Sequence, residues 1–123
     1  MTYNDLSPDE KKVIENGATE RPFSGEYDDF YPPKGKFVCK RCNNPLFSAE
    51  AKFNARCGWP AFEDCFEDSV VISEEYHPLY GAEITCAKCG GHLGHFYKNE
   101  GFTSTNMRHC VNSLSIKFIP EDE

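Results

Sequence analysis

The sequence has little positive charge and no long hydrophobic run. No apolar stretch approaches the roughly 18 residues that a membrane-spanning helix needs. Lysine and arginine number 13 against 20 acidic residues, which gives a formal net charge of -7, so we expect no nucleic-acid partner and no membrane binding. The first twelve residues show neither the basic segment nor the apolar segment of a secretory signal. From these absences we expect a soluble cytoplasmic protein.

Cysteine is the residue that the sequence has in excess. The chain has 123 residues, of which 39% are hydrophobic and 14% aromatic, and that is enough apolar mass for one core. Seven of its residues are cysteine, an odd number that leaves at least one thiol unpaired in any disulfide scheme. Without a visible secretory signal, metal binding or thiol chemistry is the first interpretation. We expect a monomer with a single domain over residues 1–123.

The pattern predicts a short N-terminal helix followed by an aromatic loop, together covering residues 1–36. Ser7, Pro8 and Glu10 have the positions of an N-cap, a first helical residue and a capping box. Gly17 is a plausible C-cap. Prolines and glycines between residues 19 and 36 predict an extended loop, which we expect to be strapped onto the core by its aromatic residues, Phe23, Tyr27, Phe30 and Tyr31.

Residues 37–119 read as a β domain. Short β-branched or aromatic segments alternate with turn residues, and the period is close to two near the C-terminus, where Leu114, Ile116 and Phe118 would share one face. We therefore predict a mainly β, largely antiparallel fold with one short N-terminal helix.

Two CxxC pairs predict a structural metal site that closes this β core. Cys39 and Cys42 form one pair, Cys86 and Cys89 the other, and Asn43 or Gly90 follows directly. Zn²⁺ is held by four thiolates in such sites, and two knuckles supply two sulfurs each. Because the pairs are far apart in sequence, the metal would clip distant parts of the domain together. Iron in the same tetrathiolate site, or two redox-active pairs, are the alternatives.

The three remaining cysteines differ in their surroundings. Cys110 is flanked by Arg108 and His109, and nearby cationic groups lower a thiol pKa, so Cys110 is the best candidate nucleophile. Cys57 stands beside Gly58, next to the only tryptophan, which suits a mobile second thiol. Cys65 has acidic neighbours that raise its pKa, and we expect a passive thiol there.

A histidine pair follows the second CxxC. In an extended segment, His92 and His95 would project to opposite faces, whereas a turn at Gly94 would change that. We expect at least one of the two in a functional site.

The motifs around these residues resemble the peptide methionine-R-sulfoxide reductases, the MsrB family, from about Leu6 to Phe118. The matching segments are Arg21–Glu26, Gly35–Cys42, Pro45–Phe47, Lys52–Phe53, Cys57–Phe62, Cys86–Cys89, Gly91–His95 and Arg108–Ser113. Three places depart from the family pattern, which leaves substrate preference open: Ala55–Arg56, Gly81–Ala82 and Asn99–Met107.

The resemblance implies a fold, an activity and a set of roles. The fold would be two antiparallel sheets with small peripheral helices and a structural zinc held by the two CxxC pairs. Cys110 would be the nucleophile, Cys57 the resolving cysteine, and Trp59 would pack on the sulfoxide methyl group. The other residues that would line the site are His92, His95, Arg108 and Asn112. The implied role is protein repair under oxidative stress.

The implied chemistry is thiol-dependent reduction of methionine-R-sulfoxide, protein-bound or free. Cys110 would become a sulfenic acid, Cys57 would condense with it to a disulfide, and thioredoxin would reduce that disulfide. We expect His95 to protonate or orient the sulfoxide oxygen. The alternatives are a non-catalytic, zinc-clipped β module that binds ligands through aromatic residues, and a rubredoxin-like electron carrier, which would need iron. A binding module of this kind does not need Cys57, Cys110 or the histidine pair.

Overall fold

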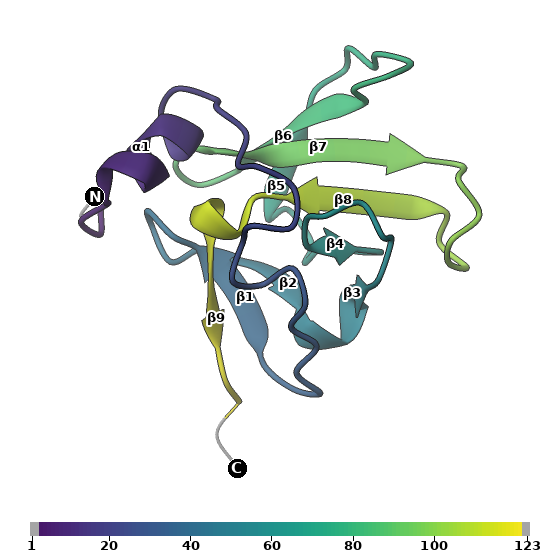
Figure 1. The fold of residues 1–123 in the computed structure, drawn as a ribbon, viewed down its shortest axis with the longest axis horizontal. Coiled ribbons are helices and arrows are strands. Elements are labelled where there is room, and N and C mark those ends of the chain that lie inside the picture. Colours follow the sequence, from purple (N-terminus) through teal and green to yellow (C-terminus); the bar gives the residue numbers. More distant parts are fainter. Residues whose placement is uncertain (1–2, 122–123) are drawn as a thin grey trace.

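The computed structural model describes residues 3–121, which form two antiparallel sheets with one short helix (Figure 1). The three-stranded sheet has the order β2-β1-β9, and the six-stranded sheet has the order β3-β4-β8-β7-β6-β5. The strands of the smaller sheet are β1 Lys36–Cys39, β2 Pro45–Ser48 and β9 Ile116–Ile119. Those of the larger sheet are β3 Lys52–Phe53, β4 Ala61–Phe62, β5 Val70–Ile72, β6 Ala82–Cys86, β7 His92–Lys98 and β8 Met107–Val111. The mainly β prediction is confirmed.

Helix α1, Pro8–Ile14, begins as predicted and ends early. The Ser7 hydroxyl accepts from the Glu10 backbone N–H at 3.2 Å, and the Glu10 carboxylate accepts from the Ser7 N–H at 2.8 Å, so the capping box is confirmed. The predicted C-cap is wrong: the cap is Glu15. Gly17 lies two residues later, where its φ of 73° turns the chain away from the helix axis.

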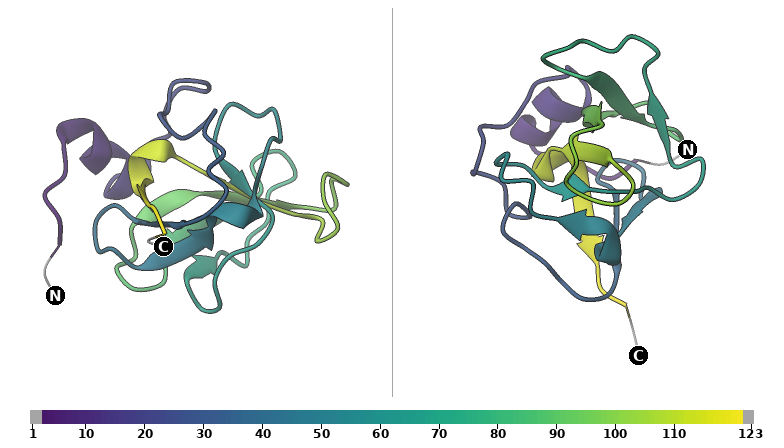
Figure 2. Two further views of the ribbon diagram at one scale, coloured as in Figure 1. Left: turned by 90° about the horizontal axis from the view of Figure 1, so that it is seen from below. Right: turned by 90° about the vertical axis from the view of Figure 1, so that its right-hand side faces the viewer.

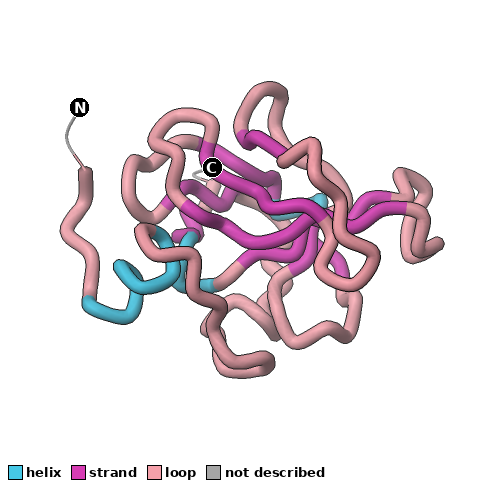
Figure 3. The backbone as a smooth tube through the Cα atoms, turned by 90° about the horizontal axis from the view of Figure 1, so that it is seen from above, coloured by secondary structure: helices cyan, strands magenta, loops and turns pink. Residues whose placement is uncertain are grey.

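The loop after α1 crosses the smaller sheet and holds onto it with two of its four aromatic residues. Tyr27 packs edge-on against Phe37 at 5.5 Å between ring centroids, and Phe30 packs likewise against Phe118 at 5.1 Å. The prediction is wrong for Phe23, whose side chain is 72% exposed. Tyr31 is also exposed and lies under the Lys52 ammonium, 3.8 Å from its ring centroid. Figure 3 shows how much of the chain such loops occupy around the strands.

The core lies between the two sheets. Phe47 of β2 and Phe62 of β4 stack with centroids 4.3 Å apart, which joins the smaller sheet to the larger one. Burial of such rings is the main stabilising contribution of a domain this size. The predicted strand near the C-terminus is shorter than expected, because Leu114 belongs to a 3-10 turn, η2 Ser113–Ser115, and β9 begins at Ile116. A second 3-10 turn, η1, covers Ala49–Ala51.

Two features of the arrangement position the site. The β7–β8 hairpin extends beyond the rest of the larger sheet (Figures 1 and 2). Helix α1 contacts η2 and also β7, at the end of β7 that lies away from this hairpin (Figure 1).

Within residues 3–121, no helix has the length and hydropathy needed to cross a membrane.

Candidate functional site

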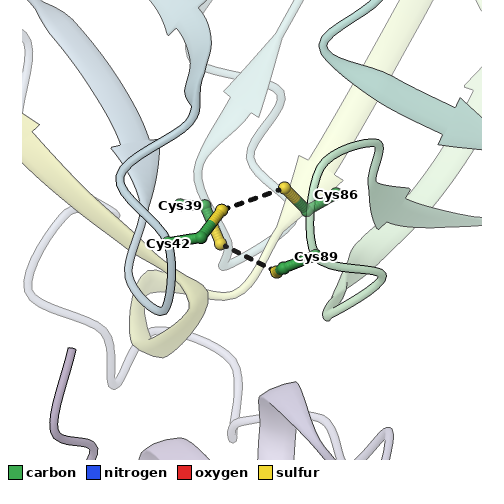
Figure 4. A group of neighbouring side chains, drawn as sticks. All are labelled: Cys39, Cys42, Cys86 and Cys89. Carbon is green, nitrogen blue, oxygen red and sulfur yellow. Dashed lines mark hydrogen bonds between the residues drawn. The ribbon is translucent and has the colours of Figure 1, made fainter. Parts of the chain in front are cut away.

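The four CxxC cysteines lie together at the junction of the two sheets. Cys39 is the last residue of β1 in the smaller sheet, and Cys86 is the last residue of β6 in the larger sheet. Cys42 and Cys89 lie in the turns that follow, and Figure 4 shows the two pairs facing each other. The left-handed backbone of Asn43 and Gly90, with φ of 66° and 76°, closes each turn.

The geometry of this cluster fits a tetrahedral metal ion. All four sulfurs lie within 4.8 Å of one another. The Sγ atoms of Cys39 and Cys89 are 3.7 Å apart, and those of Cys42 and Cys86 are 3.6 Å apart. Four sulfurs at about 2.3 Å from a central zinc would be about 3.8 Å apart, so the observed spacing leaves room for the ion. The predicted ligands are therefore brought together.

Polar groups around the cluster point toward its sulfurs. The Arg41 Nε–H donates to the Cys89 sulfur at 3.4 Å, and its second nitrogen donates to the Cys89 carbonyl at 2.6 Å. The Asn44 amide lies 3.7 Å from the Cys86 sulfur. Donors of this kind stabilise the negative charge of four thiolates, which supports a metal-type site over a set of neutral buried thiols.

Cys57 and Cys110 form a second, separate thiol pair. Their sulfurs are 3.4 Å apart, compared with about 2.05 Å in a disulfide, so a small movement would join them. Cys110 lies in the middle of β8, paired with Ala61 of β4 on one side and with His95 of β7 on the other. Cys57 lies in a loop beside Gly58, whose φ is 90°. One sulfur is thus fixed by a sheet and the other is carried by a turn.

The two thiols titrate as a pair. The hydrogen bond from Cys110 stabilises a thiolate on Cys57 and lowers the pKa of Cys57 to about 6. The same bond, together with burial, raises the pKa of Cys110. The positive charge of Arg108 adds to the lowering at Cys57 and opposes, without cancelling, the rise at Cys110. The pair therefore holds one proton and one negative charge at neutral pH.

Arg108 is fixed beside this pair by two partners. Its guanidinium donates to both oxygens of the Glu100 carboxylate, at 2.7 and 3.1 Å, and lies 4.1 Å above the Tyr97 ring. Burial alone would lower the pKa of Arg108, but the ion pair with Glu100 outweighs burial, so that the pKa lies above its ordinary value. A bidentate pair of this kind also fixes the direction of the guanidinium plane.

His109, the other predicted cationic neighbour of Cys110, does not take part. Side chains alternate along a strand, so His109 points into the core while Arg108 and Cys110 point to the other face. Its Nδ1 lies 3.0 Å from the Phe62 carbonyl oxygen, and burial lowers the pKa of His109. The expectation that His109 helps to activate Cys110 is therefore wrong.

A β-bulge brings the two predicted histidines of β7 together. The register against β6 shifts between Ile84 and Thr85, so that His92 and His95 lie on one side with ring centroids 5.6 Å apart. Burial, and then the proximity of His92, lower the pKa of His95, which leaves a neutral imidazole. The Nδ1 atom of His92 lies 2.8 Å from the Glu83 carboxylate. Of the two histidines, only His95 lines the cavity next to the thiol pair.

The thiol pair opens into a cavity of about 450 Å³, a size typical of small-molecule sites. Six of its lining residues belong to the site predicted from the sequence or the resemblance: Cys57, Trp59, His95, Arg108, Cys110 and Asn112. The remaining predicted residue, His92, lies next to His95 and does not line the cavity.

Asn112 and Trp59 are held in place by one residue of the N-terminal loop, Glu20. The Glu20 backbone N–H donates to the Asn112 side-chain oxygen at 2.9 Å, and the Trp59 indole N–H donates to the Glu20 carbonyl at 3.0 Å. The Asn112 amide also donates to the Leu93 carbonyl. The Glu20 carboxylate is buried, accepts from the Leu114 N–H at 3.0 Å, and has its pKa raised by burial. Sequence reasoning missed Glu20, because only its contacts distinguish it from other loop acids.

Several other residues of the cavity were also missed. Tyr97 belongs to β7, whereas the others come from three loops, the N-terminal loop, the β5–β6 connection and the β7–β8 connection: Thr19, Pro78, Leu79, Tyr80 and Glu100. Loop residues of mixed type carry no spacing signal, and Glu100 belongs to a segment that departs from the family pattern. Cys65 is in neither thiol group. Burial, and secondarily the charge of Asp64, raise its pKa, which agrees with the expected passive thiol.

Fold and site together define a class of protein: a two-sheet β domain that combines a closed four-cysteine cluster with an open dithiol cavity. The family described as "SelR domain" matches residues 6–120. The chain is 46% identical over 119 residues to peptide methionine sulfoxide reductase B3, chloroplastic, of Oryza sativa, covering 96% of this chain and 51% of that protein. It is 43% identical over 119 residues to peptide methionine sulfoxide reductase MsrB of Bradyrhizobium diazoefficiens, covering 95% and 84%.

The chain therefore belongs to the SelR domain family, and the resemblance to the MsrB reductases is confirmed. It spans about half the length of two of its curated relatives, 51% of the rice protein and 57% of peptide methionine sulfoxide reductase B2, chloroplastic, of Arabidopsis thaliana.

Proposed function

We propose that this protein is an oxidoreductase that reduces methionine-R-sulfoxide, in proteins or free, to methionine. The observation that carries the proposal is the cavity that contains two thiols 3.4 Å apart, in a chain of the SelR domain family. A module that only binds ligands would have no use for two adjacent thiols of which one, Cys57, has a lowered pKa. The R stereochemistry follows the names of the relatives and is part of the proposal.

Cys110 is the nucleophile in this mechanism, and Cys57 is first its proton acceptor. The lowered pKa of Cys57 means that the pair already has one negative charge, and transfer of the shared proton places that charge on Cys110. Cys110 suits the attacking role because β4 and β7 hold it on both sides. Its sulfur attacks the sulfoxide sulfur, and the S–O bond breaks as the proton held by Cys57 passes to the oxygen. Methionine leaves, Cys110 carries the oxygen as a sulfenic acid, and Cys57 is left as a thiolate.

The cavity residues orient the sulfoxide and stabilise the charge that develops during this step. A neutral His95 can donate a hydrogen bond from its N–H to the sulfoxide oxygen and so orient it, and Arg108 supplies a fixed positive charge. The Trp59 ring, held by its bond to Glu20, offers a flat apolar surface for the methyl group. Asn112 fixes β8 to the N-terminal loop and to Leu93.

Cys57 then resolves the sulfenic acid. Its sulfur attacks the Cys110 sulfur, a disulfide forms, and the oxygen leaves as water. A dithiol reductant, for which we propose thioredoxin, exchanges with this disulfide, becomes oxidised itself and restores both thiols. The loop position of Cys57 beside Gly58 allows the small approach that the bond requires.

The four-cysteine cluster has a structural role in this account. Cys39, Cys42, Cys86 and Cys89 would hold one Zn²⁺, and these four thiolates would then be linked across the two sheets. We also propose that residues 1–123 form one catalytic domain and that the protein is a monomer in the cytoplasm.

The test is reduction of the separated R and S diastereomers of a methionine sulfoxide peptide, with dithiothreitol as reductant. We expect turnover of the R form alone, and thioredoxin should replace dithiothreitol in the native protein. In Cys57→Ser, thioredoxin-supported turnover should cease while one sulfenic acid per chain still forms. Failure to reduce either diastereomer in a folded, zinc-replete sample would overturn the proposed function and favour the ligand-binding module.

A further inference from the structure

The hairpin at residues 76–81, between β5 and β6, contributes to the cavity and is unused by the mechanism above. Pro78, Leu79 and Tyr80 line the cavity from this hairpin. Leu79 is 73% exposed and Tyr80 is 64% exposed, so both apolar side chains face solvent at the cavity mouth. We call these two residues the lip.

The lip is held in position by one side chain, that of His77. Its Nδ1 accepts the backbone N–H of Leu79 at 3.0 Å and that of Tyr80 at 3.2 Å. Its ring stacks on the Tyr80 ring with centroids 4.7 Å apart. Two backbone hydrogen bonds with Gly81, at 2.8 and 2.9 Å, close the hairpin behind it.

The hairpin is also attached to the larger sheet, so the lip has a defined place over the cavity. The Lys98 backbone N–H, at the end of β7, donates to the Tyr76 hydroxyl at 3.2 Å. The Lys98 ammonium lies 5.1 Å from the centroid of the same ring. β7 is the strand that carries His95, so the lip and the thiol pair are positioned by the same sheet.

We propose that Leu79 and Tyr80 form a specificity site for an apolar residue next to methionine sulfoxide in a peptide, with His77 as its positioning residue. The inference rests on the proposed function. A sulfoxide sulfur that reaches Cys110 lies deep in the cavity, so the main chain and neighbouring side chains of its peptide must lie at the mouth. Apolar contact there would remove exposed surface of the lip from water and tighten binding.

The test uses three blocked R-sulfoxide substrates: the tripeptide with leucine on both sides, the same tripeptide with serine, and the single blocked residue. We expect kcat/KM to be about tenfold higher for the leucine peptide than for the serine peptide, through KM. The double variant Leu79→Ser/Tyr80→Ser should reduce this ratio to about one, because the leucine peptide loses far more kcat/KM than the serine peptide and the single residue. Val71→Ser, at an exposed apolar position on β5 outside the cavity, should keep the full ratio.

His77 is tested by rescue. His77→Ala should lose the preference for the leucine peptide by raising its KM, with kcat unchanged. His77→Asn should restore most of it, because an asparagine side chain can accept from the backbone N–H two residues ahead. Circular dichroism and melting temperature check the fold, and the single variant Tyr80→Ser replaces the double variant if the latter does not fold.

The outcomes separate the two proposals. If the native protein reduces none of the three substrates, the proposed function fails. If it reduces them all with equal kcat/KM, or if the lip variants lower kcat/KM equally for all three, the function stands and the specificity site is overturned.

Discussion

The two groups of cysteines in this protein show how surroundings decide what a thiol can do. The cluster of Cys39, Cys42, Cys86 and Cys89 brings four sulfurs within 4.8 Å, takes two from each knuckle, and joins the two sheets. The pair of Cys57 and Cys110 brings two sulfurs to 3.4 Å at the wall of a cavity.

The difference lies in backbone support and access. In the cluster, each CxxC turn closes on a left-handed residue, and Arg41 and Asn44 point toward the sulfurs. In the pair, one sulfur is on a central strand and the other is in a loop, with Arg108 beside them. Four sulfurs in fixed turns suit an ion, whereas two sulfurs with unequal support suit a bond that forms and breaks.

The largest expected effect is the loss of turnover in Cys110→Ser. Removing the proposed nucleophile should lower kcat/KM for a methionine-R-sulfoxide peptide by about 10³-fold or more, while metal content and melting temperature stay unchanged. Cys65→Ser is the matched control and should keep native activity, because Cys65 lies outside both thiol groups. A Cys110→Ser protein with activity within tenfold of the native value would contradict the assignment.

For Cys42→Ser, the expected changes are in metal content and stability, the two properties that Cys110→Ser should leave unchanged. Removing one ligand from the cluster should cost metal affinity and lower the free energy of unfolding by about 3 kcal/mol or more, because metal binding in such sites contributes to folding directly. Metal analysis and denaturant unfolding measure the two effects. Full metal content with an unchanged unfolding midpoint would remove the structural role of the cluster.

A smaller effect, specific to the pair, is expected for Glu100→Gln. The substitution removes the bidentate ion pair that directs the Arg108 guanidinium, so kcat/KM should fall by about tenfold with little change in stability. Glu67→Gln, at an exposed position outside the cavity, is the control. Equal activity of both variants would show that the orientation of Arg108 does not matter.

The smallest effect concerns pH. The pKa of Cys57 is lowered to about 6, so its thiolate is present above that pH and is lost as the pH falls through it. Alkylation of Cys57 by iodoacetamide, followed by peptide mass spectrometry, should be half-maximal near pH 6. In Cys110→Ala the thiolate loses its S–H donor, and the midpoint should move up toward about 8.5. An unchanged midpoint would mean that the two thiols do not share a proton.

The cluster could be predicted from the sequence more fully than the pair. A CxxC knuckle is a local motif, so spacing alone identified all four members. The nearness of Cys57 to Cys110 depends on the pairing of β4 with β8 and came only from the resemblance.

Side-chain direction was harder to predict than strand location. The alternation of β8 turns His109 into the core, and a bulge against β6 brings His92 beside His95. A bulge depends on the partner strand, which no local pattern shows. Glu20, Glu100 and the lip residues lie in loops, where only tertiary contacts reveal what a side chain does.

The most direct measurement is a map of all seven cysteines after one turnover. The zinc-loaded protein is reduced, freed of reductant, given one equivalent of methionine-R-sulfoxide peptide, denatured in acid, and digested for mass spectrometry. We expect one methionine per chain and one disulfide, between Cys57 and Cys110, with no disulfide among the four cluster cysteines. A disulfide that includes a cluster cysteine, or product without any Cys57–Cys110 bond, would contradict the assignment of metal binding to the cluster and of redox chemistry to the pair.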